Sequence, residues 1–75
     1  MDTQTKADMR VIDMHVGSRV RIARKQSNNM SQTELGEKLG LTFQQVQKYE
    51  RGFNRISAST LFTIARILGR KVEWF

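Results

Sequence analysis

The chain has 75 residues, about half the length of a typical domain, so it has room for one small domain. It contains no cysteine and a single histidine, which excludes disulfides, thiolate ligands and a histidine-based metal centre. Thirteen lysines and arginines against seven aspartates and glutamates give a net charge of +6. A chain this basic usually binds a polyanion, so its composition favours nucleic acid and predicts no metal or cofactor.

The charge and the pattern both change near residue 13. Residues 1–15 hold two bases and three acids, whereas the rest of the chain holds eleven bases and four acids. The first residues are polar and lack helical periodicity, which predicts a flexible tail over 1–12 and one domain over 13–75. No apolar run is long enough for a signal peptide or a membrane span, so we expect a cytoplasmic protein.

The domain begins with a predicted helix that runs from residue 13 to about residue 26. Its apolar residues recur at spacings of four, four and three, which places them on one stripe: Ile12, Val16, Val20 and Ala23. The stretch Ser27-Asn28-Asn29 ends this helix, because its side chains favour local hydrogen bonds to the backbone. Proline is absent from the whole sequence, and the sequence predicts an all-α fold.

Two short helices follow, joined by a turn centred on Gly40. Ser31 and Glu34 have the spacing of a capping box, which starts the first of them, and Gly40 ends it. Thr42 and Gln45 have the same spacing at the start of the second. Gly52 closes the second helix. Two helices connected in this way cross steeply, as in a helix-turn-helix, although a generic helical hairpin fits capping and glycine equally well.

The residue types resemble the Cro and phage-repressor type of helix-turn-helix, the XRE family. The resemblance covers about residues 16–75 and includes a further helix that carries Leu61, Ile64, Ala65 and Leu68. It implies a lambda-repressor-like compact bundle of four to five short helices. The loop 27–30 is one residue longer than usual, and the chain ends where the fifth helix starts, which leaves the dimer interface undetermined. The motif residues are Ser31-Gln32-Thr33-Glu34-Leu35-Gly36, Leu39-Gly40-Leu41-Thr42, Val46 and Tyr49-Glu50-Arg51-Gly52.

In this family the second helix of the motif, here 43–51, lies in the DNA major groove. The resemblance implies that four outward residues read base edges: Phe43, Gln44, Gln47 and Lys48. Gln44 suits adenine, Lys48 suits guanine and Phe43 suits a thymine methyl group. A solvated helix face is the alternative for the polar residues, and Phe43 could instead pack back onto the core.

Phosphate contacts are implied for residues at the two ends of the motif, namely Gln32, Arg51, Asn54 and Arg55. Arg19 and Lys25 are equally consistent with a phosphate contact and with a solvated face. Glu50 would repel phosphate, so we expect it to face inward. The resemblance implies an ion pair between Glu50 and an arginine late in the first helix, for which Arg24 is the candidate and Lys25 or Arg21 are the alternatives. At the chain end, Trp74 and Phe75 are large and apolar, and we expect one of them to close the core.

The leading hypothesis is a sequence-specific DNA-binding transcriptional regulator, most simply a repressor that binds a two-fold symmetric site as a homodimer. By resemblance it is bacterial or phage-encoded. The alternative is a protein-interaction module such as an antitoxin, which an exposed aromatic patch of Phe43, Phe53 and Phe62 would support. Enzymatic activity is not expected, because Glu34 and Glu37 lack a third ligand for a metal and no base lies beside a nucleophile.

Overall fold

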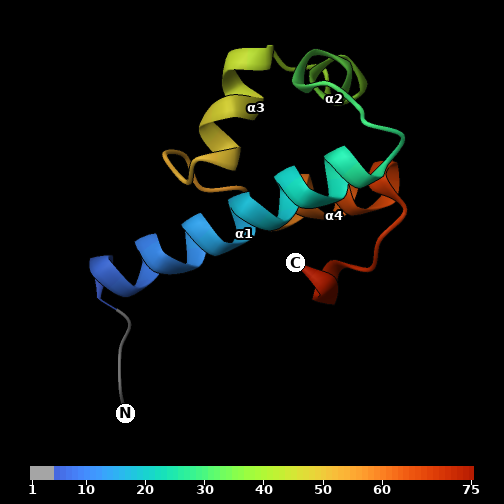
Figure 1. Cartoon of the computed structure of the whole chain (residues 1–75). Helices are drawn as coiled ribbons and strands as arrows, with labels where there is room; N and C mark the ends of the chain where they lie inside the picture. Colours follow the sequence, from blue (N-terminus) through green and yellow to red (C-terminus); the bar gives the residue numbers. More distant parts are fainter. Residues whose placement is uncertain (1–4) are drawn as a thin grey trace.

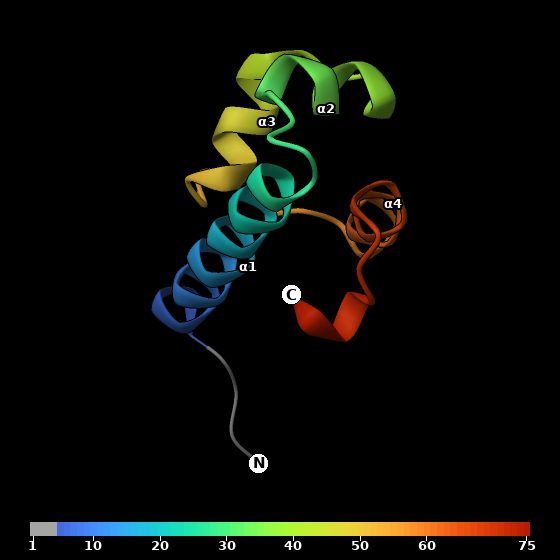
Figure 2. The same ribbon diagram turned by 45° about the vertical axis from the view of Figure 1, so that its right-hand side comes forward.

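The computed structural model describes residues 5–75, which form an all-α bundle, as predicted (Figure 1). The two helices of the motif lie together on one side, and the longest helix runs beneath them (Figures 1 and 2). The last helix packs beside the longest one and is followed by a single 3₁₀ turn. The elements are α1 (Lys6–Gln26), α2 (Gln32–Leu39), α3 (Phe43–Glu50), α4 (Ala58–Leu68) and η1 (Val72–Trp74).

Helix α1 begins at Lys6, so the prediction of a tail through residue 12 is wrong for residues 6–12. A capping box starts the helix: the Thr5 hydroxyl accepts a hydrogen bond from the Asp8 amide, and the Asp8 carboxylate accepts one from the Thr5 amide. Apolar residues in the first turns of α1, such as Val11, are largely exposed. These turns therefore lack the regularly spaced apolar residues by which a packed helix is predicted from sequence. Residues 1–4 of the predicted tail lie outside the described residues.

The C-terminal end of α1 lies where the sequence predicts it. The helix stops at Gln26, and Asn28 and Asn29 take left-handed conformations with φ of 58° and 53°, which asparagine tolerates better than most residues. The Arg24 guanidinium also donates to the carbonyl of Met30 at 2.6 Å. A side chain of α1 therefore holds the loop 27–30 in place.

The α2–α3 connection is as tight as the glycine spacing predicts. Ser31 and Glu34 form the capping box of α2, and Thr42 Oγ1 accepts from the Gln45 amide at 3.2 Å to begin α3. Gly40 ends α2 with φ of 72°. A Cβ at Gly36 would lie 2.7 Å from the Leu41 carbonyl oxygen. The backbone of the turn therefore packs where any other residue would place its side chain.

The largest fully buried side chains of the core come one from each α-helix, namely Val20, Leu35, Val46 and Ile64. Phe75 packs against this core and is buried, whereas Trp74 is only partly buried. One of the two C-terminal aromatic residues therefore closes the core, as predicted. Within residues 5–75, no helix is long and apolar enough to cross a membrane.

Candidate nucleic-acid interface

Helix α3 has one buried and one exposed face. Val46 and Glu50 are buried, while Phe43, Gln44 and Lys48 are exposed on the other side, with 46% of Phe43 accessible. Because these residues lie within two helical turns, they form one continuous surface. Gln47 is half-buried, which makes it the least exposed of the four predicted base-reading residues.

Beside α3 lies a hollow of about 500 Å³ at the junction of α1, α2 and α3. The N-terminus of α2 opens into it, where the helix dipole favours an anion. Three of the basic residues on its wall, Arg21, Lys25 and Arg51, are exposed. The fourth, Arg24, is buried and neutralises the acidic Glu50. The lining residues that bear on anion binding are Arg21, Lys25, Ser31, Gln32, Gln47 and Arg51.

Glu50 faces inward and pairs with Arg24, not with Arg21 or Lys25. The Arg24 Nε lies 2.6 Å from Glu50 Oε2, and Arg24 Nη2 donates to Glu50 Oε1 at 3.0 Å. Only 8% of the arginine side chain and 3% of the glutamate side chain are exposed. This bidentate pair joins the end of α1 to the end of α3 and fixes how the two helices cross.

Gln32 joins the same network. Its Nε2 donates to Glu50 Oε1 at 3.0 Å, and the residue is half-buried. The amide therefore has one side-chain N–H left for a phosphate. The resemblance assigned Gln32 to phosphate alone, and nothing in its sequence position signals the bond to Glu50, which lies 18 residues away.

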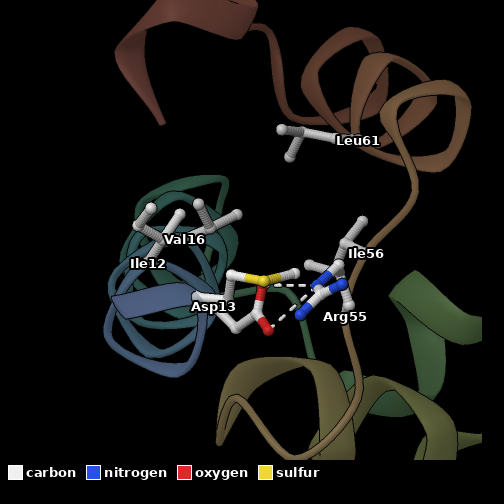
Figure 3. Close-up of a pocket in the computed structure, with 7 residues that line it drawn as sticks. Ile12, Asp13, Val16, Arg55, Ile56 and Leu61 are labelled. Atoms are coloured by element: carbon white, nitrogen blue, oxygen red, sulfur yellow. Dashed lines mark hydrogen bonds and ion pairs between the residues drawn. The ribbon is translucent and has the colours of Figure 1, made fainter. Parts of the chain in front are cut away.

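The loop after α3 exposes Arg51, Asn54 and Arg55, the other predicted phosphate contacts. Arg55 is tied to α1: its Nε lies 3.2 Å from Asp13 Oδ2, with 56% of the arginine side chain and 16% of the aspartate side chain exposed. Figure 3 shows this pair on the wall of a hollow of about 250 Å³ whose other lining residues are mostly apolar, such as Ile12 and Leu61. Sequence reasoning missed Asp13, because a contact spanning 42 residues leaves no local pattern.

Arg19, for which the sequence left two alternatives open, contacts the chain end instead. Its guanidinium lies 3.7 Å from the centre of the Trp74 ring and donates twice to the Trp74 carbonyl oxygen, at 3.2 and 2.9 Å. Arg70 also lies over the Trp74 ring, at 4.1 Å. Lys25 remains exposed at the edge of the hollow beside α3.

The aromatic residues that would support a protein-interaction module are each exposed, but they come from different parts of the chain. Phe43 lies on α3, Phe53 lies in the following loop and Phe62 lies on α4. Phe53 lines a hollow against α1, whereas Phe62 lines another beside the chain end.

The comparisons with known proteins agree with this arrangement. An HTH-type transcriptional regulator of Sinorhizobium medicae is 56% identical over 64 residues, which make up 85% of this chain and 45% of the relative. One of Sinorhizobium fredii is 49% identical over 72 residues, 96% of this chain and 50% of the relative. A transcriptional regulator in the ATPase CF(0) region of Rhodospirillum rubrum is 48% identical over 64 residues, 85% of this chain and 58% of the relative.

All three relatives are described as uncharacterized, and the chain spans about half the length of the curated relatives it matches. The family model described as "Helix-turn-helix" matches residues 20–75, which contain the end of α1, the α2–α3 motif, α4 and η1. The chain therefore belongs to the helix-turn-helix family, of the XRE type that its motif resembles.

Proposed function

We propose that this chain binds double-stranded DNA sequence-specifically and regulates transcription, with α3 as the helix that reads the major groove. The observation that carries the proposal is the exposed polar face of α3, which is held outward by the buried Val46 and Glu50 on its other side. The major groove is about 12 Å wide and admits one helix. The relatives named as HTH-type transcriptional regulators support the same assignment.

The base-reading roles are assigned by chemistry and exposure. Gln44 pairs with adenine, Lys48 donates to guanine and Phe43 packs on a thymine methyl group. Gln47 has a smaller role, because it is half-buried and lines the hollow beside α3.

Phosphates are held on both sides of this face. Gln32 and the N-terminus of α2 take one, while Arg51, Asn54 and Arg55 take others from the loop after α3. The net charge of +6 supplies the long-range attraction to the duplex.

We further propose that the protein acts as a repressor and binds as a homodimer. A two-fold symmetric pair of α3 helices would read two half-sites about one helical turn apart. A protein that occupies a promoter in this way needs no catalytic activity to block transcription.

The test is selection of bound sequences from a random DNA pool, repeated with Gln44→Ala and Lys48→Ala. We expect a symmetric motif in which each substitution relaxes one position, at a cost of about 1–3 kcal/mol for the preferred base. Lys38→Ala, which removes an exposed lysine on α2, is the matched control for Lys48→Ala and should leave the motif unchanged. Failure to enrich any motif would refute sequence-specific binding.

A further inference from the structure

The first turns of α1 lie outside the part of the chain that the family model matches, yet they adjoin the loop after α3. The matched residues begin at residue 20, whereas α1 begins at Lys6. In Figure 1 this N-terminal half of α1 runs out past the motif, beside the loop that leaves α3. Any DNA contact made from it would widen the interface beyond the helix-turn-helix itself.

One stripe of α1 faces the end of α3 and the loop that follows. A Cβ at Gly17 would collide with the Tyr49 carbonyl oxygen, so the two backbones touch there. One turn earlier, Met14 packs against Gly52, where an added Cβ would lie 2.7 Å from its side chain. Asp13 then reaches Arg55.

Arg10 is the next residue on this stripe, three positions before Asp13. It lines a hollow of about 360 Å³ together with Asp13, Gly52, Phe53 and Arg55. The hollow therefore joins α1 directly to the loop that follows the proposed reading helix.

The charge of this hollow is positive. Residues 5–75 contain two ion pairs, Arg24–Glu50 and Asp13–Arg55, and Arg10 takes part in neither. Asp13 offsets one of the two guanidinium groups and contacts it through Nε, which leaves the terminal N–H groups of Arg55 free to bind an anion. Arg10 is exposed and contributes a second fork of donors beside them.

On the basis of the proposed function, we propose that Arg10 and Arg55 together bind the DNA backbone, so that α1 adds a phosphate contact outside the helix-turn-helix. The phosphate backbones bound the major groove, so a duplex that holds α3 also passes the loop at the end of α3. A guanidinium binds phosphate bidentately. Two guanidinium groups around one hollow therefore favour a phosphate there over a neutral or cationic group.

The test compares Arg10→Ala with Arg66→Ala, which removes an exposed arginine from α4 instead. Affinity for the enriched DNA sequence and for a random duplex is measured by fluorescence anisotropy over a range of salt concentrations. We expect Arg10→Ala to make the plot of log K against log salt shallower by about 0.9 and to weaken both duplexes by the same factor. Arg10→Lys should retain most of the slope, because it keeps the charge.

The outcomes separate this inference from the proposed function. If the unchanged protein enriches and binds a DNA motif but Arg10→Ala has the same salt slope as Arg66→Ala, the Arg10 contact is refuted and the proposed function stands. If Arg10→Ala weakens only the enriched sequence, Arg10 acts on bases and the phosphate assignment is wrong. If the unchanged protein binds no DNA, both proposals fall.

Discussion

At the scale of single residues, the buried pair of Arg24 and Glu50 is the contact on which the position of α3 depends. The carboxylate accepts from Arg24 and from Gln32, and the same guanidinium also reaches the Met30 carbonyl oxygen. This one ion pair thus links α1, the loop 27–31, α2 and α3. Such a pair adds modest net stability, but loss of one partner leaves the other buried without compensation.

We therefore expect Glu50→Gln to lower the free energy of unfolding by about 3–5 kcal/mol, because it strands the Arg24 charge. Urea denaturation followed by circular dichroism measures the change. Gln44→Ala, on the exposed face of the same helix, is the control and should change stability by less than about 0.5 kcal/mol. Equal midpoints for the two variants would show that the pair does not stabilise the fold.

Contacts between residues far apart in the sequence were predictable only where a residue type was unexpected at its position. A carboxylate at the end of the proposed DNA-reading helix is such a contradiction, and it predicted that Glu50 faces inward, while the family resemblance supplied Arg24 as its first candidate partner. The Asp13–Arg55 pair and the Arg19–Trp74 contact carry no such signal, because each residue is also plausible as a solvated charge. Only the folded arrangement brings these partners together.

At the scale of elements, helix ends were the best-predicted feature, because capping is local. Ser31, Thr42 and Gly40 mark the bounds of α2 and α3 within a few residues of where they act. The start of α1 was missed for a related reason: Thr5 and Asp8 form an equally local cap, but the helix they begin has no buried stripe for its first turns.

The capping box of α2 should make stability depend on pH. Hydrogen bonds from the backbone and side chain of Ser31 hold the pKa of Glu34 below its ordinary value of 4.5. A lowered pKa means that the folded state prefers the carboxylate, so this contribution is complete above pH 4.5 and is lost as pH falls through the lowered value.

We expect Glu34→Gln, which retains the capping geometry without the charge, to melt a few degrees lower than the unchanged protein near neutral pH. The difference in melting temperature should shrink as pH falls below 4.5 and should vanish in stronger acid. Melting curves collected from acid to neutral pH measure it. A difference that is constant across this range would show that the Glu34 charge does not stabilise α2.

The crossing of α1 and α3 depends on Gly17, which no pattern in the sequence singles out. Alanine favours a helix by about 1 kcal/mol over glycine. At this position, however, the added Cβ would collide with the Tyr49 carbonyl oxygen and lie 2.9 Å from that of Glu50.

Gly17→Ala should therefore destabilise the protein by about 1–3 kcal/mol, because overpacking outweighs the gain in helix propensity. Ser18→Ala, at the neighbouring exposed position, is the control and should be nearly neutral. Chemical denaturation of both variants gives the comparison. An unchanged or raised stability for Gly17→Ala would mean that α1 and α3 do not pack this closely.

At the scale of the whole molecule, α1 contacts every part of the surface for which a DNA contact is proposed. Its C-terminal end supplies Arg24 to the base of α3, its middle packs against the end of α3 at Gly17, and its N-terminal half reaches the loop at Arg55. The sequence predicted the order and core of the four helices, because those follow from local periodicity. The sequence did not predict these three contacts of α1, because they depend on how the long helix is placed against α3 and the loop that follows it.

The chain end is joined to α1 by a stack in which Trp74 lies against two guanidinium groups. Arg19 on α1 and Arg70 after α4 both lie over its ring, and Arg70 is held by Gln26 at the end of α1. This arrangement keeps Phe75 in the core, because the two residues are neighbours and their rings meet edge to face at 5.1 Å. Arg19 and Arg70 thus both hold the chain end against α1.

Arg19→Lys tests this role while keeping the charge. Lysine has no planar group to stack on the ring, and its ammonium cannot donate the two hydrogen bonds that the guanidinium makes to the Trp74 carbonyl oxygen, so we expect a loss of about 1–3 kcal/mol in unfolding free energy. The sole tryptophan reports the change directly: its emission should move to longer wavelength in the folded variant as the ring becomes more exposed to water. Arg66→Lys, on the exposed face of α4, should change neither quantity. If Arg19→Lys left the emission and stability unchanged but weakened DNA binding, Arg19 would be a phosphate contact and the stack would not be what anchors the chain end.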